Sequence, residues 1–114
     1  MIQIFGTRKC KETRKAERFF KERGINFQFI DLKVKEISKG ELNSISRSIP
    51  LVELIDKDGK EYENRNLKYI KYNIEEELLE NPLLFKTPII RNGQQAINCY
   101  DPEILKKWAE EEKQ

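Results

Sequence analysis

The sequence predicts a mixed α/β fold of a single domain, residues 1–114, and three observations lead to this class. The first 32 residues follow the pattern strand, helix, strand. The middle of the chain, about residues 36–82, carries helix signals and forms a helical insertion. The last third holds a hairpin signal and then a helix pattern. A βαβ unit, a helical insertion, a β-hairpin and a C-terminal helix together require a mixed sheet.

The βαβ unit is predicted from the change in hydrophobic period over the first residues. Residues 2–5 are mostly apolar and form a short strand that stops at Gly6-Thr7. Apolar residues recur at helical spacing over about residues 10–23, and Gly24 is a typical C-terminal cap. Residues 27–32 then form the second strand. Two strands joined by one helix are expected to lie parallel.

The insertion is predicted to hold three helices, with a turn or loop at residues 56–59 and a mixed pattern over residues 67–79. Ser38 is followed three residues later by Glu41, which is the pattern of a capping box at the start of a helix. The apolar run 51–55 indicates a second short helix. Residues 74–80 indicate a third, which ends at Asn81-Pro82.

The C-terminal part returns to strand patterns. Residues 88–90 form a strand, Asn92-Gly93 is a strong hairpin signal, and residues 96–100 supply the returning strand. Asp101 is an N-cap with Pro102 at the first helical position, which predicts the last helix. This order of elements is that of a thioredoxin-like fold. The aromatic residues expected in its core are Phe19, Phe20, Phe27, Phe29 and Trp108.

Composition excludes several classes of function. The chain has 22 Lys and Arg against 20 Asp and Glu, so its net charge of +2 gives no case for nucleic-acid binding. No apolar run is long enough to cross a membrane, and the N-terminus lacks a secretory signal. We therefore expect a cytoplasmic protein, monomeric by default, without a bound cofactor.

The chain contains no histidine and only two cysteines, Cys10 and Cys99. This excludes Cys–His and Ser–His hydrolytic sites. Two distant cysteines without histidine fall short of the usual four zinc ligands, so no metal is expected. In a reducing cytoplasm both cysteines are expected to be free thiols. An enzyme built from this sequence needs a thiol activated by something other than imidazole.

Cys10 is the candidate nucleophile because it lies where the first strand segment enters the first helix. Unpaired N–H groups and the helix dipole at this place stabilise a thiolate and lower a cysteine pKa. The four cations Arg8, Lys9, Lys11 and Arg14 are expected to act in the same direction, and Thr13 can offer its hydroxyl to the sulfur. The alternatives are an inert thiol and a basic run that is only a solvated helix face.

Two other residues allow two interpretations each. Cys99 lies within a predicted strand, which favours plain core packing; the alternative is a resolving thiol that forms a disulfide with Cys10. Pro88 opens a strand, and sequence alone favours a trans peptide bond before it.

The order of these motifs resembles the arsenate reductase/Spx family over essentially the whole chain. The segments that carry the resemblance are FGTRKCKETRKA (5–16), Gly24-Ile25 with the strand FQFIDL (27–32), NPLL (81–84) and TPII (87–90). The resemblance implies a thioredoxin-like fold and a cis peptide before Pro88. It assigns the nucleophile to Cys10, and it places Thr13 where Spx-type regulators have a second cysteine.

The chain departs from the family at the anion site. The resemblance implies three arginines that hold an oxyanion in glutathione-dependent arsenate reductases, and these positions fall on Asp56, Thr87 and Tyr100. Lys57, Lys86 or Arg91 could replace one arginine, but lysine offers no bidentate fork. Efficient arsenate reduction is therefore not expected.

The resulting prediction is a monothiol oxidoreductase that uses glutathione or a similar low-molecular-weight thiol and acts on a small thiol or disulfide. Cys10, Thr13 and Arg14 form the expected catalytic group, and the expected substrate contacts are Arg8, Lys9, Thr87 and Pro88. The alternative is an Spx-like regulatory protein that binds a protein partner such as RNA polymerase without catalysis.

Overall fold

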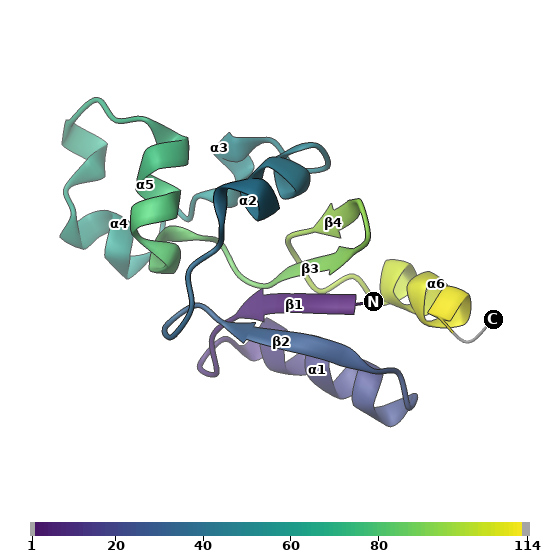
Figure 1. Ribbon diagram of the computed structural model, residues 1–114. Coiled ribbons are helices and arrows are strands. Elements are labelled where there is room, and N and C mark those ends of the chain that lie inside the picture. The colour runs from purple at the N-terminus through teal and green to yellow at the C-terminus, as the bar shows by residue number, and fades with distance from the viewer. Residues whose placement is uncertain (1, 113–114) are drawn as a thin grey trace.

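The sheet has four strands in the order β2-β1-β3-β4 in the computed structural model, which describes residues 2–112 (Figure 1). The central strand β1 (Ile2–Gly6) runs parallel to the edge strand β2 (Phe27–Asp31). On its other side it pairs antiparallel with β3 (Ile89–Asn92), which pairs antiparallel with β4 (Gln95–Ile97). The parallel β1–β2 pair and the hairpin confirm the predicted mixed sheet.

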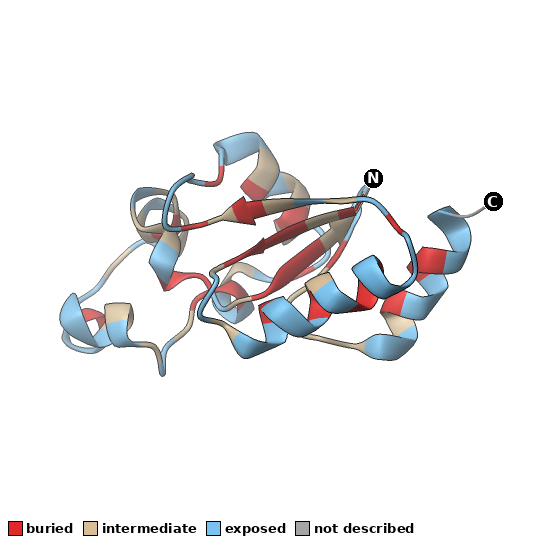
Figure 2. Ribbon diagram, turned by 90° about the horizontal axis from the view of Figure 1, so that it is seen from below, coloured by how far each residue is buried: buried red, intermediate tan, exposed pale blue. Residues whose placement is uncertain are grey.

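Helices α1 (Lys11–Glu22) and α6 (Pro102–Glu112) cover one face of the sheet (Figures 1 and 2). Helix α1 ends as the sequence predicts, because Gly24 takes a positive φ of 65° that other residues rarely adopt. The buried side chains of this layer include Ile4, Phe20, Ile90, Leu105 and Trp108.

The predicted insertion between β2 and β3 is helical. Its helices are α2 (Lys39–Ser46), α3 (Leu51–Leu54), α4 (Lys60–Asn64) and α5 (Ile74–Glu80), with 3-10 turns η1 (Leu67–Tyr69) and η2 (Pro82–Leu84). The capping box is formed: Ser38 Oγ accepts from the Glu41 N–H at 3.2 Å, and Glu41 Oε1 accepts from the Ser38 N–H at 3.0 Å. The bounds of α5 match the sequence prediction.

The insertion packs against the second face of the sheet. Successive side chains of a strand point to opposite faces, so Phe5 and Ile89 face the insertion while their neighbours Ile4 and Ile90 face α1 and α6. The buried partners on the insertion side include Leu42, Ile45, Leu54, Leu78 and Leu84. Figure 2 shows the buried residues gathered on the strands and on the sheet-facing sides of the helices.

A short antiparallel contact ties the insertion to the segment that precedes β3. Ile55 pairs with Phe85, the Lys86 N–H donates to the Leu54 carbonyl at 2.7 Å, and the Asp56 N–H donates to the Leu84 carbonyl at 2.8 Å. Helix α3 therefore stops at Leu54, one residue earlier than the predicted run 51–55, because Ile55 is extended and used in this pairing.

Two expectations about the strands and the core are corrected, and one helix was not predicted. Strand β4 ends at Ile97, so the predicted strand 96–100 is too long and Cys99 lies outside it, exposed. Phe27 and Phe29 are only partly buried, because β2 is an edge strand. Helix α4, rich in charged residues, gave no apolar pattern from which it could be predicted.

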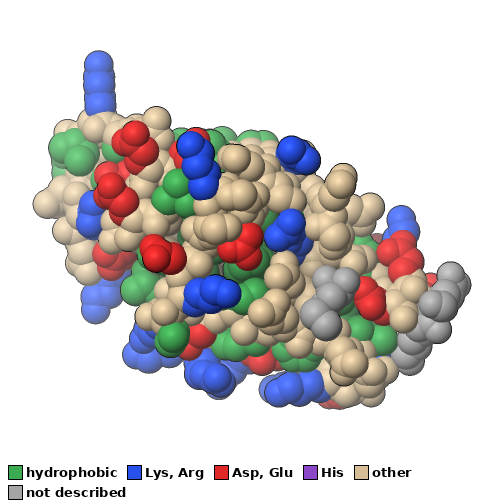
Figure 3. Space-filling view, in the orientation of Figure 1, with side chains coloured by type: hydrophobic (Ala, Val, Ile, Leu, Met, Phe, Trp, Pro, Cys, Tyr) green, Lys and Arg blue, Asp and Glu red, His purple; other side chains and the backbone are tan. Residues whose placement is uncertain are grey.

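Positive and negative side chains are interspersed over the face shown in Figure 3. Within the described residues, no helix combines the length and the apolar character that a membrane crossing requires.

Candidate functional site

Cys10 is the N-cap of α1, as the sequence predicts for the nucleophile. Its backbone is extended, with φ −76° and ψ 118°, and its N–H donates to the Thr7 carbonyl at 3.2 Å. Its own carbonyl accepts the N–H of Arg14 at 3.2 Å, which starts the helix. The side chain is half-buried and forms no disulfide. The thiol is therefore fixed at a helix N-terminus and remains open to a reactant.

The site lies at the carboxyl ends of the parallel strands. β1 ends at Gly6 and β2 ends at Asp31, and the Leu32 N–H donates to the Gly6 carbonyl at 2.9 Å. Parallel strands end at the same edge of a sheet. Lys33, which follows Leu32 just beyond the end of β2, therefore comes close to the segment around Cys10.

Thr87 approaches the thiol from the other side of the chain. The Thr87–Pro88 peptide bond is cis, as the family resemblance implies and against the trans bond that sequence statistics favour. The Cys10 thiol donates to the Thr87 carbonyl over an Sγ–O distance of 3.7 Å. Pro88 itself is buried directly before β3, whereas Thr87 is only half-buried.

The pKa of Cys10 is lowered from its ordinary value. Burial acts to raise this pKa, but hydrogen bonds from the Thr13 and Thr87 side chains and from the backbone of Thr13 and Glu12 stabilise the thiolate and outweigh it. The Thr13 hydroxyl is fully buried and has no other hydrogen-bond partner among residues 2–112, so it is free to donate to the Cys10 thiolate. Hydrogen bonds, rather than the cations expected from the sequence, lower the pKa.

The four cations expected beside Cys10 lie in different places. Arg8 is turned toward β2: its Nε lies 3.9 Å from Asp31 Oδ2 and its guanidinium lies 5.4 Å from the centre of the Phe29 ring. Lys11 and Arg14 are exposed on α1. Lys9 lines a cavity beside the site. Of the expected basic contacts, only Lys9 therefore faces this cavity.

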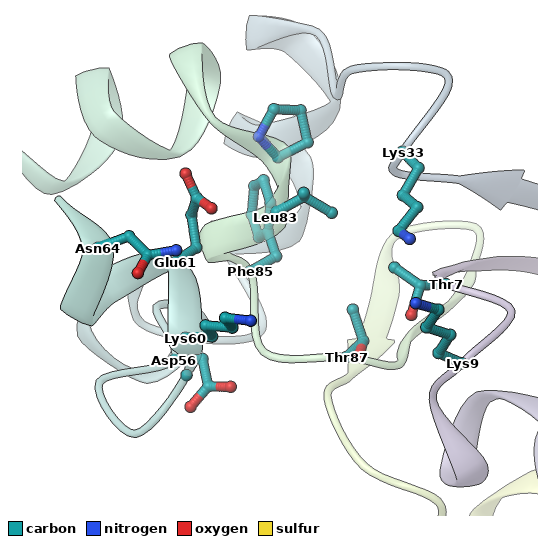
Figure 4. Close-up of a pocket in the computed structure, with 12 residues that line it drawn as sticks. Thr7, Lys9, Lys33, Asp56, Lys60, Glu61, Asn64, Leu83, Phe85 and Thr87 are labelled. Atoms are coloured by element: carbon teal, nitrogen blue, oxygen red, sulfur yellow. The ribbon is translucent and has the colours of Figure 1, made fainter.

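The cavity has a volume of about 280 Å³ and lies between the sheet edge and the insertion (Figure 4). Thr7 and Thr87, both in contact with Cys10, form part of its wall. Three lysines line it, together with two carboxylates and apolar residues of η2. The charged lining residues are Lys9, Lys33, Lys60, Asp56 and Glu61.

Sequence reasoning missed Lys33 and Lys60. Lys33 could have been found, because it follows the second parallel strand at the same edge as Cys10. Lys60 could not, because it reaches the cavity from α4, whose position depends on the packing of the insertion.

The three positions that stand in for the family's arginines do not meet at one point. Asp56 and Thr87 both line the cavity, so a carboxylate and a hydroxyl face it where the resemblance implies cations. Tyr100 does not line this cavity; its ring packs on Phe19 with centroids 6.4 Å apart.

None of the three suggested replacements for the family's arginines, Lys57, Lys86 and Arg91, lines the cavity. Arg91 is held by hydrogen bonds to the Gly93 carbonyl at 3.0 Å, to Gln3 at 3.3 Å and to Ser44 at 2.9 Å. Lys57 and Lys86 line a separate depression.

Cys99 is exposed, so its predicted core packing is wrong. Burial of the sulfur and the negative charges of Asp101 and Glu12 raise the pKa of Cys99, while Lys86 acts in the opposite direction. The two cysteines therefore differ: Cys10 is shifted toward the thiolate and Cys99 toward the thiol. A resolving role for Cys99 stays a prediction. Among residues 2–112, His, Cys, Asp and Glu form no group of three that could hold a metal ion.

Comparison with known proteins agrees with this geometry. The profile of the ArsC family matches residues 5–108. No curated protein matches the sequence. Among solved structures, the YFFB protein superposes with a TM-score of 0.80 at 18% identity, covering 94% of this chain and 97% of that one.

Two further solved structures show the same fold. The arsenate reductase from Vibrio cholerae has a TM-score of 0.77 at 21% identity, over 93% of this chain and 95% of its own. An arsenate reductase (ArsC) related protein from Brucella melitensis has a TM-score of 0.66 at 18% identity, over 94% of this chain and 92% of its own. At these identities the similarity shows the fold and leaves the substrate open.

Proposed function

This chain belongs to the ArsC family, and we propose on that basis that it is a thiol–disulfide oxidoreductase whose nucleophile is Cys10. One observation carries the proposal: a half-buried thiol of lowered pKa caps α1, touches the Thr87 carbonyl and adjoins an open cavity. A lowered pKa supplies the thiolate at neutral pH, which is the reactive form.

The proposed reaction is a monothiol exchange. The Cys10 thiolate attacks one sulfur of a disulfide RS–SR′, forms the mixed disulfide Cys10–S–SR and releases R′S⁻, which takes up a proton. A second thiolate, from glutathione or a similar small thiol, then attacks the R sulfur. It forms the new disulfide and releases the Cys10 thiolate. The net result is an exchange: R′S⁻ leaves, the small thiol takes its place in the disulfide with R, and the Cys10 thiolate is regenerated with no bound cofactor; a further small thiol that attacks this new disulfide releases RS⁻ and completes the two-electron reduction.

The hydroxyl of Thr13 is the group we expect to stabilise the Cys10 thiolate in both steps. It is buried beside the sulfur and has no competing partner within residues 2–112. Thr87 contributes its side chain to the thiolate, and we expect the backbone next to Pro88 to pair with the bound disulfide substrate. Arg14 contributes its N–H to the helix start, while its side chain points to solvent.

Arsenate is the less favoured acceptor. The anion has to lie against Cys10, yet the nearby cavity wall presents the Asp56 carboxylate and the neutral Thr87 at two positions where the family resemblance implies arginine. Like charges repel most strongly where water is partly excluded. We expect the cytoplasm as the setting, because small thiols are kept reduced there.

A Spx-like regulatory role is the second candidate. It is favoured by exposed apolar side chains on the insertion, namely Val52, Tyr69 and Ile70, which are 52%, 79% and 54% exposed. Exposed apolar groups of this kind can contribute to a protein interface. Such a role needs the surface of the insertion but does not need the Cys10 thiol.

The test compares Cys10→Ser with Cys99→Ser as its matched control. Each reduced protein is mixed with hydroxyethyl disulfide, and intact mass follows the mixed disulfide. The proposal expects rapid adduct formation in the wild type and in Cys99→Ser, and none at residue 10 in Cys10→Ser. Adduct formation on Cys99 alone would refute the proposal, and retention of a protein partner by Cys10→Ser would then favour the regulatory role.

A further inference from the structure

The positive charge of the protein is concentrated on helix α1 and the residues that flank it. Residues 8–23 hold eight Lys and Arg against three Glu, whereas the rest of the chain holds 14 Lys and Arg against 17 Asp and Glu. A net charge of +5 over this segment is therefore set against −3 over all other residues. In Figure 3, where the signs are otherwise mixed, Lys and Arg side chains gather along the lower edge, where Figure 1 places α1.

The cations of α1 share one exposed side of the helix. Positions three and four apart lie on the same side of an α-helix. Lys11 and Lys15 are four residues apart. Arg14 and Arg18 are also four apart, and Lys21 follows three residues later. All five side chains are exposed, and we call them the basic face of α1. Among the residues that the structure describes, none of the five lies within 4.0 Å of a carboxylate oxygen as an ion pair.

This arrangement is unfavourable for the helix itself. Like charges four residues apart destabilise a helix, and a cation in the first turn opposes the helix dipole. Lys11 is the first residue of α1. The basic face does not serve the thiol either, because the groups that lower the pKa of Cys10 are hydrogen-bond donors and include none of these cations. The charge therefore has no stabilising role that the fold or the thiol would explain.

The basic face borders a groove of about 280 Å³ between α1 and the start of α6, and three cations line this groove: Lys15, Arg18 and Arg23. Arg23, the C-cap of α1, is held in place. Its Nη1 donates to the Phe19 carbonyl at 3.2 Å, and its guanidinium carbon lies 3.6 Å from the centre of the Phe19 ring. A guanidinium that is already fixed loses less freedom when it binds a carboxylate.

The other wall of the groove is apolar. Tyr100 and Pro102 line it, and the Tyr100 ring packs on Phe19 with centroids 6.4 Å apart. Glu22 is the one carboxylate that the described lining contains, so the groove has a net charge of +2. A nucleic acid carries a continuous row of phosphates, which would meet Glu22 and would leave the apolar wall without a partner. A polypeptide can present carboxylates to the cations and an apolar side chain to this wall.

We propose that the basic face of α1 and the adjoining groove bind an acidic segment of another protein. Carboxylates of that segment contact Lys15, Arg18 and Arg23, and one of its apolar side chains lies against Tyr100. Exposed charges of one sign attract a partner of the opposite sign and orient it as it approaches. The interaction goes beyond the proposed thiol exchange, because none of these contacts involves the Cys10 thiol.

The experiment measures binding by fluorescence anisotropy, with the full chain titrated into a fluorescein-labelled peptide of Glu and Asp residues that contains one Leu. We expect binding that weakens steeply as salt is added, because screening acts on exposed charges. A matched peptide with Gln and Asn in place of Glu and Asp should not bind. Cys10→Ser should bind the acidic peptide as tightly as the wild type does.

The decisive variant replaces the three cations of the groove by Gln: Lys15, Arg18 and Arg23. An exposed ion pair contributes enough for about a two- to fivefold effect per cation, so the Kd should rise about tenfold or more. The matched control removes the same charge from the helical insertion. It replaces three exposed lysines by Gln, and its Kd should stay close to that of the wild type: Lys39, Lys68 and Lys71.

A second variant separates binding from folding. Arg23 also packs on Phe19, so Lys15→Gln/Arg18→Gln leaves that contact intact while it removes two cations of the groove. Because it also relieves like-charge repulsion along α1, its urea midpoint should be equal to that of the wild type or higher. Its Kd should nevertheless rise about fourfold or more. An unchanged Kd in this double variant would overturn the proposal.

The remaining outcomes also decide the question. Equal loss of binding in the groove variant and in the insertion control would mean that only net charge matters, and would overturn the proposal. Absence of peptide binding in the wild type would do the same, as would its loss in Cys10→Ser. Tighter binding of single-stranded DNA, or of vesicles of phosphatidylcholine and phosphatidylserine, at the same salt concentration would assign the face to a nucleic acid or a membrane and overturn the protein partner.

Discussion

Gly6 makes room for the Thr13 hydroxyl beside Cys10, and Gly6→Ala is therefore expected to damage both packing and reactivity. A Cβ at position 6 would lie 2.6 Å from Thr13 Cγ2 and 3.1 Å from its Cβ, and closer still to Oγ1. Real Cβ atoms do not approach neighbours so closely. The requirement is steric, since Gly6 does not have a positive φ.

The magnitude follows from the burial of both partners. Gly6 and Thr13 are buried, and α1 is packed against the sheet through Phe19 and Phe20, so the clash cannot be relieved at the surface. Overpacking of this kind costs about 1–3 kcal/mol. At about 4–8 °C per kcal/mol for a domain of this size, the melting temperature should fall by about 4 °C or more.

The assay is urea unfolding followed by the fluorescence of Trp108, which is the only tryptophan, is 2% exposed and donates its indole N–H to Gln95. Gly40→Ala is the matched control, because nothing lies within 4 Å of its added Cβ and it lies in α2. A helical Gly→Ala change of this kind should stabilise by about 0.5–1 kcal/mol.

A double-mutant cycle decides whether the clash is the cause. Thr13→Ala removes the two atoms nearest to the added Cβ, so Gly6→Ala should cost less by about 0.5–3 kcal/mol in the Thr13→Ala protein than in the wild type. Additive free energies of unfolding would refute the steric explanation. Displacement of the Thr13 hydroxyl should also raise the pKa of Cys10, measured from its alkylation rate against pH.

Four further outcomes are expected. In single-cysteine variants, alkylation of Cys10 should have its midpoint below the ordinary thiol value and alkylation of Cys99 above it, because their pKa values shift in opposite directions; coincident midpoints would contradict this. The pKa of Cys10 is lower in the folded state than in the unfolded state. Cys10 therefore contributes stability that is complete above the unfolded-state pKa and is lost as the pH falls through the folded-state pKa. Urea unfolding at a series of pH values can follow this loss. Ser38→Ala should cost about 1 kcal/mol in the same unfolding assay through loss of the α2 cap, and an unchanged midpoint would show that the cap contributes nothing. The hydrogen bond to Tyr62, together with burial and negative charge nearby, raises the pKa of Tyr72 to about 12. Tyr62→Phe should therefore lower the pKa of Tyr72 toward 10 in an ultraviolet titration. An unchanged pKa would mean that the two tyrosines are not in contact in solution.

Most of the fold could be predicted because its signals are local. The Ser38 cap, the Gly24 stop, the Asn92-Gly93 turn and the Pro102 helix start each act within a few residues, and all four are formed. Strand length could not be predicted in this way. The residues after Ile97 are apolar enough for a strand, but β3 offers pairing to β4 only as far as Ile97, so Cys99 is left exposed.

The place of Cys10 directly before a helix could be predicted, but the surroundings of its thiol could not. Arg8 precedes Cys10 by two residues and is nonetheless turned toward Asp31 and Phe29, because a side chain at the surface follows its nearest partners. Lys60 is fifty positions away in the sequence and reaches the adjoining cavity. Which charges face a site depends on tertiary packing, and hydrophobic periodicity carries no information about it.

The residues Phe85–Thr87 belong to two neighbourhoods at once. Phe85 and Lys86 are paired with Ile55 and Leu54 of the insertion, and the next carbonyl, that of Thr87, receives the Cys10 thiol. A shift of the insertion relative to the sheet therefore also shifts the Thr87 carbonyl that accepts from the Cys10 thiol. Across substitutions in the insertion, the exchange rate of the Lys86 amide hydrogen and the alkylation rate of Cys10 should vary together. The packing of the insertion helices can therefore change the reactivity of Cys10 without any contact between these helices and the sulfur.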